Sequence, residues 1–374
     1  MQLSNVLSIQ ESMNKWKVFL RRYLSMREPV TYVILLVFIS AVWLIGLACK
    51  PATSAIPPTA FENKSMIDGV AFTAPDREIP SQKIATVKQT GADWICILPY
   101  GFCYRDKPEV RFDSKNQWWG ERTEGVIKQI EHAQTHDLKV LLKPHIWVIG
   151  QGWLGDFELS TEADWQKWED GYTTYILRYA HIADSMDVAL FCIGTEAKRI
   201  IAHRPDYMPE LIKKIKNIYD GKLTYAANWD NYKQIKFWDQ LDYIGIDAYF
   251  PLTNQKAPTV EQLQQAWQPH YNEIKSFALD ADRPIIFTEF GYMSVEGTAW
   301  KNWEIESSLK TQQISMVEQE NAFEAFFKTF WHEDWFAGGF IWKWYAWDNS
   351  GGISDKDYTP QGKPVMATIQ KYYR

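Results

Sequence analysis

Short apolar segments recur along the chain from about residue 62 to residue 374, and longer polar or amphipathic segments separate them. Eight of these segments are continuously apolar rather than alternating, which is the pattern of strands buried on both faces of a parallel sheet. They are Ile67–Pro75, Ala92–Tyr100, Leu138–Val148, Val188–Glu196, Leu223–Asp230, Leu241–Phe250, Arg283–Tyr292 and Phe336–Asp348. Eightfold alternation of strand and helix predicts an α/β fold, a single (β/α)₈ TIM barrel over residues 62–374.

The intervening segments show helical spacing of apolar residues. Thr161 opens one of them with a sequence close to a capping box. The segment after the fifth strand is too short for a clear helix. The expected helices are 81–90, 121–136, 161–186, 209–219, 259–278 and 311–331.

The N-terminal region has a different character. Tyr32–Ala48 carries no charge, and a basic segment precedes it, with Lys15, Lys17, Arg21, Arg22 and Arg27. This pattern predicts a signal peptide or a membrane anchor whose basic flank stays in the cytoplasm. A buried core helix is the alternative, but the segment is apolar on every side and a Pro/Thr/Ala-rich linker follows. We therefore expect an anchor region at 1–49, a linker at 50–61 and a catalytic barrel at 62–374.

Cys49 ends the apolar segment after small residues, an arrangement that resembles a bacterial lipoprotein signal. Gly46 stands where an aliphatic residue is usual, so an uncleaved single-pass anchor with an unmodified Cys49 is the alternative. Met26 offers a second possible start and a more ordinary signal length. In each case the barrel is expected in the cell envelope, tethered to the membrane outside the cytoplasm.

Composition excludes several classes of protein. The net charge of −6 argues against a nucleic-acid partner. Cys96, Cys103 and Cys192 are an odd set without a CxxC spacing, so neither a disulfide framework nor a zinc site is expected. The sequence shows no phosphate-binding glycine loop, and we expect no cofactor, no metal and a monomer. The 19 Trp, 19 Tyr and 19 Phe residues exceed what a core needs and suit flat ligands such as sugar rings.

Two glutamates end apolar strands at the expected active face of the barrel. Glu196 ends the fourth strand and Glu289 lies in the last turn of the seventh. Alternation places Glu196 with Cys192, and Glu289 with Ile285 and Phe287; if both sets face the lumen, the carboxylates meet at one opening. Two carboxylates in one cleft suit glycoside hydrolysis. The alternative is that each pairs with a nearby Lys or Arg.

The segments FCIGTE and IIFTEFGY resemble glycoside hydrolase family 113, within clan A of the retaining glycosidases, whose known activity is on β-1,4-mannans. The resemblance covers about 62–374 and includes the tail at 358–364. It implies that Glu196 is the general acid/base and Glu289 the nucleophile. Thr195 stands where most of the clan has Asn, which leaves open the residue that holds the sugar 2-hydroxyl. Tyr249, at the end of the sixth strand, is expected to orient the nucleophile.

Other residues at strand ends are expected to contact the substrate, a polysaccharide or oligosaccharide. His145 follows the third strand, and Asn228 and Trp229 end the fifth. Trp342 and Trp344 share a side of the eighth strand, and either would form an aromatic floor at the cleavage point. Asp247 is expected either to anchor a neighbour or to touch sugar. Tryptophans in the strand-to-helix loops are candidates for outer subsites or loop packing, namely Trp118, Trp119, Trp153, Trp300 and Trp303.

Three alternatives compete with a β-mannanase. Another clan A β-glycanase acting on glucan or xylan would share the fold and the glutamates. A non-catalytic surface carbohydrate-binding barrel would not need both glutamates, yet both are present. A metal-dependent barrel hydrolase wants clustered His and Asp, whereas only His145 among the 7 histidines lies at a strand end.

Overall fold

The computed structural model describes residue 61, residues 66–150 and residues 152–373. The chain divides into two units, 1–57 and 58–374, and the description below concerns the second. The expected anchor Tyr32–Ala48, the expected lipidation site Cys49 and the linker up to residue 60 lie outside the described residues. Within the described part of the chain, no helix is long and apolar enough to span a membrane.

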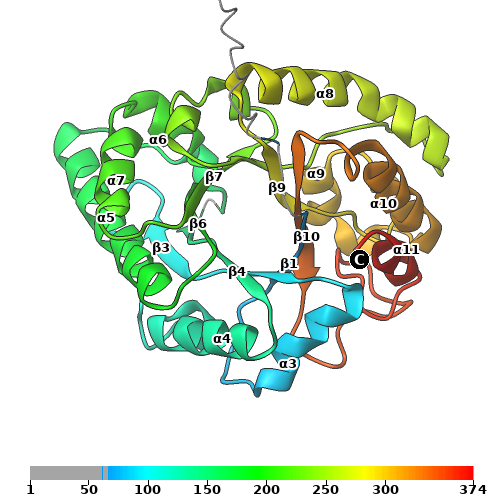
Figure 1. Ribbon diagram of the computed structural model, residues 1–374, viewed down its shortest axis with the longest axis horizontal. Helices are drawn as coiled ribbons and strands as arrows, with labels where there is room; N and C mark the ends of the chain where they lie inside the picture. The colour runs from blue at the N-terminus through cyan, green and yellow to red at the C-terminus, as the bar shows by residue number, and fades with distance from the viewer. Residues whose placement is uncertain (1–60, 62–65, 151, 374) are drawn as a thin grey trace, which may run out of the picture. The chain divides into compact units, whose positions relative to one another are not determined.

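Eight parallel strands close into a barrel, in the order β1-β2-β4-β6-β7-β8-β9-β10, with β10 paired to β1 (Figure 1). The (β/α)₈ prediction is confirmed. The strands are β1 (Ile67–Phe72), β2 (Trp94–Ile97), β4 (Lys139–Leu142), β6 (Leu190–Thr195), β7 (Lys222–Asn228), β8 (Ile244–Asp247), β9 (Ile285–Phe290) and β10 (Phe336–Trp344).

Helices surround the barrel strands (Figure 1). They are α3 (Ser81–Ala85), α4 (Thr123–Thr135), α5 (Glu162–Ser185), α6 (Lys198–His203), α7 (Tyr207–Lys216), α8 (Val260–Ala281), α9 (Asn302–Ser307), α10 (Met316–Phe330) and α11 (Val365–Tyr372). Thr161 caps α5 by accepting from the Asp164 N–H, as its sequence predicts. After β7 the chain makes only two short 3₁₀ turns, Tyr232–Gln234 and Trp238–Gln240, which agrees with the weak helical signal there.

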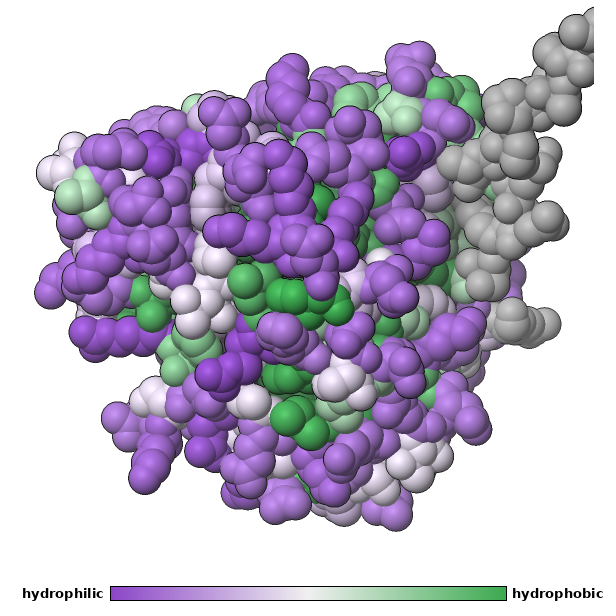
Figure 2. Space-filling view, turned by 60° about the vertical axis from the view of Figure 1, so that its left-hand side comes forward, coloured by the Kyte–Doolittle hydropathy of each residue, from purple (hydrophilic) through white to green (hydrophobic). Residues whose placement is uncertain are grey.

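The apolar side chains form two layers on either side of the barrel wall. A small cluster that includes Ala71, Cys96, Cys192, Ile286 and Phe340 fills the lumen. A much larger cluster lies between the strands and the helices. The outer surface in Figure 2 is mostly hydrophilic, with smaller hydrophobic areas between the polar side chains. The wall is therefore buried on both faces, which explains why its strands read as continuous apolar runs.

A proline interrupts two of the predicted strands. The predicted strand Leu138–Val148 is wrong as a single element, because β4 ends at Leu142 and a new strand, β5 (His145–Ile149), starts after Pro144. Pro99 separates β2 from β3 (Tyr100–Tyr104) in the same way. Proline cannot donate a ladder hydrogen bond, so each strand leaves the barrel at this point. β3 and β5 pair with each other in a parallel, two-stranded ribbon outside the barrel sheet.

Strand β9 contains a bulge that changes which side chains face the lumen. Ile246 pairs with Phe287, but Asp247 pairs with Glu289, so β9 has one extra residue relative to β8. Phe287 and Ile285 lie in the outer cluster with Ile246. The expectation that Glu289 shares the lumen side with those two residues is therefore wrong. The extra residue, Thr288, resets the alternation and places Glu289 beside the inward-facing Asp247.

Candidate active site

The carboxylate of Glu289 has three partners at the C-terminal end of the barrel. Tyr249, which follows β8, donates its hydroxyl to Oε2 at 2.8 Å. The Nζ atom of Lys143 donates to Oε1. His145 Nε2 lies 3.4 Å from the same oxygen. Thus the structure brings Tyr249 and His145 to Glu289, and adds a lysine.

Lys143 lies between two carboxylates in the interior of the barrel. Its side chain has no exposed surface, and Nζ is 3.3 Å from Asp247 Oδ1 in addition to its contact with Glu289. Asp247 also accepts from the Thr288 hydroxyl at 2.7 Å, so it anchors neighbouring side chains. The sequence prediction missed Lys143. The signal was a lysine directly after the apolar segment Val140–Leu142, since a charge buried at that position needs partners.

These contacts set the ionisation of Glu289. Burial by itself acts to raise the pKa of this carboxyl. The charge of Lys143 and the contact with His145 outweigh burial, so the pKa of Glu289 lies well below its usual range. Burial and Lys143 also lower the pKa of His145, which keeps its imidazole neutral at pH 7. Glu289 is consequently a carboxylate under ordinary conditions.

Glu196 lies directly after β6 and has a different set of contacts. Its backbone is left-handed, with φ of 49°, which is uncommon for a residue with a side chain. The Glu196 N–H donates to Ala226 O at 2.8 Å, and the next N–H, of Ala197, donates to the buried Tyr225 hydroxyl at 2.8 Å. These bonds to β7 hold the turn. The Trp153 indole N–H donates to Glu196 Oε2 at 2.6 Å.

The pKa of Glu196 lies well above its usual range. Burial is the largest cause, and the negative charges of Asp247 and Glu289 add to it. The Trp153 hydrogen bond and Lys143 act in the opposite direction but are weaker. Among the described residues, no Lys, Arg or His forms an ion pair with Glu196 of the kind that Lys143 forms with Glu289. The two glutamates therefore have pKa values shifted in opposite directions.

The other predicted contact residues at the fifth strand lie at the rim. Asn228 ends β7, and its Oδ1 accepts from the Trp229 N–H at 3.0 Å. The ring of Trp229 stacks on Trp303, with centroids 6.0 Å apart and planes at 14°. Trp303 itself is exposed. Among the other loop tryptophans, Trp118 is exposed and Trp119 is buried.

Trp342 and Trp344 do not share a face. Ala71 pairs with Trp342 and Phe72 with Trp344, so β10 has one extra residue, Lys343, relative to β1. Trp342 packs against the lumen cluster and remains partly exposed. Trp344 is buried in the outer layer, where its indole donates to Thr86 Oγ1 at 2.9 Å. The prediction of Trp344 as a substrate contact is therefore wrong, and Trp342 is the candidate.

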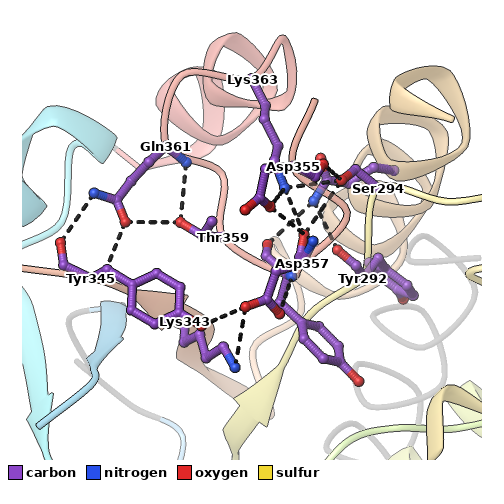
Figure 3. Close-up of polar contacts among 11 residues, drawn as sticks. Tyr292, Ser294, Lys343, Tyr345, Asp355, Asp357, Thr359, Gln361 and Lys363 are labelled. Carbon is purple, nitrogen blue, oxygen red and sulfur yellow. Dashed lines mark hydrogen bonds and ion pairs between the residues drawn. The ribbon is translucent and has the colours of Figure 1, made fainter. Parts of the chain in front are cut away.

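The loop after β10 is held by a network of polar contacts that links it to Lys343, Tyr345 and Ser294 (Figure 3). Lys343 Nζ lies 3.4 Å from Asp357 Oδ2, and the Tyr345 hydroxyl donates to the same carboxylate. Lys363 donates to Ser294, Asp355 and the backbone oxygen of Asp357. The ring of Tyr358 in this loop meets Tyr249 edge-on, with centroids 6.1 Å apart. The tail at 358–364 thus supports the tyrosine that holds Glu289.

No cluster of His, Cys, Asp and Glu in the described part of the chain is arranged to hold a metal ion. The two glutamates and their neighbours are the candidate reacting groups at this opening. Comparison with known proteins defines the class of protein to which this barrel belongs. The protein is a glycoside hydrolase, an enzyme whose substrate is a carbohydrate.

The chain belongs to Glycoside Hydrolase Family 113, whose sequence model matches residues 76–363. The fold is similar to the GH113 β-mannanase AaManA from Alicyclobacillus acidocaldarius, with TM-score 0.74, 22% identity and coverage of 84% of this chain and 99% of that one. A GH113 β-1,4-mannanase matches with TM-score 0.70 and 24% identity, covering 83% and 99%. A Ruminococcus gnavus β-glucuronidase is more distant, with TM-score 0.57, 12% identity and coverage of 83% and 50%. No curated relative matches the chain.

Proposed function

We propose that the protein hydrolyses β-1,4-mannosidic linkages in mannan or glucomannan by double displacement, with Glu289 as nucleophile and Glu196 as acid/base. The observation that carries the mechanism is the contrast between the contacts of the two glutamates. A buried lysine contacts Glu289, whereas Glu196 is buried beside negative charge. Family membership, and the β-mannanases among the similar structures, support the choice of mannan.

In the first step, the Glu289 carboxylate attacks the anomeric carbon of the sugar. The bond from that carbon to the leaving oxygen breaks, and Glu196 gives its proton to this oxygen. Tyr249 holds Oε2 of the nucleophile through a hydrogen bond of 2.8 Å, which fixes the direction of the attack. The product is a glycosyl ester on Glu289 and a shortened chain.

In the second step, water attacks the same carbon and Glu196 accepts the proton from it. Formation of the ester has removed the negative charge of Glu289, which is one of the causes of the raised pKa of Glu196. The pKa of Glu196 falls accordingly, so the residue that was an acid serves as a base. The ester bond breaks, Glu289 regains its charge, and one water is consumed.

The test uses the purified full chain with mannan, glucomannan, cellulose and xylan, beside a Glu289→Ala variant. Chromatography should show manno-oligosaccharides with the first two polysaccharides only, and none with the variant. NMR of the first products should show the β-anomer, which a double displacement retains. Products from cellulose or xylan alone would replace the substrate, an inverted anomer would refute the mechanism, and binding without products would indicate a carbohydrate-binding barrel.

We further propose that the protein is exported and tethered to the membrane by Tyr32–Ala48 or by a lipid on Cys49. The uncharged segment after a basic flank supports this location. Cell fractionation and protease accessibility of the wild type and a Cys49→Ala variant provide the test. Retention of both in the membrane fraction would favour an uncleaved anchor, loss of the variant alone would favour lipidation, and soluble cytoplasmic protein in both would refute the proposal. Size-exclusion chromatography of the same samples measures the monomer that we expect.

A further inference from the structure

The ribbon formed by β3 and β5 has two different faces. Pairing places Tyr100 opposite His145, Phe102 opposite Trp147 and Tyr104 opposite Ile149. Because side chains alternate along a strand, these residues lie on one face, which we call the outer face of the ribbon. The residues between them, all buried, form the other face: Gly101, Cys103, Ile146 and Val148.

The outer face exposes large apolar side chains to an unusual extent. Trp147 is 51% exposed, and Tyr104 and Ile149 are 38% exposed. His145 and Tyr100, at the start of the two strands, are partly buried, so exposure rises with distance from the barrel. Exposed apolar side chains that lie next to one another are more typical of a binding surface than of ordinary surface.

Aromatic rings on the outer face continue from the candidate nucleophile. His145 Nε2 lies 3.4 Å from Glu289 Oε1, the His145 and Tyr100 rings are 5.3 Å apart, and the Tyr100 and Phe102 rings are 6.5 Å apart. Phe102 is paired with Trp147 in the next register position. A ligand at Glu289 that extends along this face would therefore meet one ring after another.

The same segment also leads to the second glutamate. A bridge between Val148 and Gly152 turns the chain back beside Trp147, whose indole lies next to Gly152. Trp153, the following residue, donates to Glu196. The ribbon thus contacts Glu289 through His145 and leads along the chain to Trp153, which contacts Glu196. The outer face is therefore continuous with the candidate active site.

The chemistry of the outer face points to sugar rings. A pyranose has an apolar C–H surface that packs on aromatic rings, and hydroxyls at its edge that bind charged donors. The outer face carries aromatic rings and no charged side chain, while Arg111 and Lys107 lie over the ring of Tyr104, at 5.4 Å and 5.7 Å from its centroid. Those two cations supply donors at its far end.

We propose that the outer face binds sugar units of a β-linked glycan beyond the unit that is cleaved, with Trp147 as the principal contact. The inference rests on the proposed function, since the glycan reaches the ribbon from the cleavage point. It assigns to the enzyme a preference for chains of several sugars over short glycosides, carried by a ribbon that leaves the barrel.

The test compares Trp147→Ala and Trp147→Phe with the wild type on mannohexaose and on an aryl β-mannoside, which occupies only the cleavage point and its leaving group. Trp147→Ala should lower kcat/KM on mannohexaose about tenfold, and by a much smaller factor on the aryl glycoside. Trp147→Phe keeps an aromatic ring and should recover part of the loss. Leu279→Ala is the matched control, because Leu279 is 52% exposed near the end of α8, on the side where β9 begins, and should change neither rate.

Equal losses on the two substrates, or no loss on either, would overturn the proposal. If the wild type cleaves neither mannan nor glucomannan, the proposed function fails by itself, and calorimetry of a Glu289→Gln variant with mannohexaose, cellohexaose and xylohexaose tests the outer face separately. Weaker binding of the hexaose that binds best, after adding Trp147→Ala, would support a glycan subsite. Unaltered binding, or no binding of any hexaose, would refute it.

Discussion

The two sides of the active-site opening treat chemically identical side chains in opposite ways. On the β9 side, Glu289 meets a buried lysine, a neutral histidine and a tyrosine hydroxyl. On the β6 side, Glu196 meets a single indole N–H and two nearby negative charges. Both carboxyls are buried, so burial does not distinguish them. The difference lies in the nearest charge, because Lys143 forms an ion pair with Glu289 and none with Glu196.

Substitution of either glutamate should cause the largest loss of activity. Glu289→Gln removes the nucleophile, and we expect activity on mannan to fall on the order of 10⁴-fold. Glu196→Gln should lose a similar factor on mannan but far less in the first step with an activated aryl glycoside, whose leaving group needs no proton. Burst kinetics measure that step separately.

Glu261→Gln, at an exposed position in the first turn of α8, is the control and should be fully active. Equal residual rates for the two glutamate variants on the activated substrate would contradict the assignment of roles. Melting curves close to the wild type would show that the losses are catalytic rather than structural.

Removal of Lys143 should show how its charge affects the pKa of each glutamate. Lys143→Met takes away the charge that lowers the pKa of Glu289, so the acidic limb of kcat/KM should move to higher pH. Lys143 also lowers the pKa of Glu196, so the alkaline limb should move to higher pH as well. We expect a loss on the order of 10²-fold at the wild-type optimum, measured as a full pH–rate profile.

Asp247→Asn should shift the alkaline limb in the opposite direction to Lys143→Met. Asp247 raises the pKa of Glu196, so its neutralisation should move the alkaline limb to lower pH. A shift of both variants in one direction would argue that the profile reports misfolding rather than the charges around the two glutamates.

A smaller effect is expected at the hydroxyl that orients Glu289. Tyr249→Phe removes one hydrogen bond to a charged group, which is worth about 1.5–3 kcal/mol, or about 10- to 100-fold in rate. The loss should appear in kcat more than in KM if the bond orients the attack. A change confined to KM would make Tyr249 a substrate contact instead.

The smallest effect concerns the indole that contacts Glu196. Trp153→Phe removes a donor that favours the ionised form, so the pKa of Glu196 and the alkaline limb should rise. We expect less than about a tenfold loss in rate, as for one ordinary hydrogen bond. A fall of the alkaline limb would show that Trp153 acts mainly by excluding water.

The sequence was sufficient for the barrel because continuous apolar runs report burial on both faces of a strand. It was also sufficient to select Glu196, Glu289, Tyr249 and His145, since each follows or ends such a run. The structure places both Tyr249 and His145 in contact with Glu289. Their catalytic roles remain predictions. Lys143 was missed because its partners lie 104 and 146 residues away along the chain, a distance that no local pattern covers.

Both errors about the side of the strand on which a side chain lies have the same cause. Strict alternation placed Glu289 with Phe287 and Trp344 with Trp342, and both pairings are wrong. In each strand one extra residue lies just before the opening, Thr288 in β9 and Lys343 in β10. Bulges near active sites are frequent, but they leave no trace in a hydropathy pattern of continuously apolar strands.

The bulge at Thr288 also makes the length of β9 matter for the orientation of Glu289, in addition to its composition. Loss of a single codon there would restore regular pairing and turn Glu289 toward the apolar layer beneath α8 and α10, although both candidate glutamates would still be encoded. We expect an insertion or deletion of one residue in β9 to separate an active barrel from an inactive one.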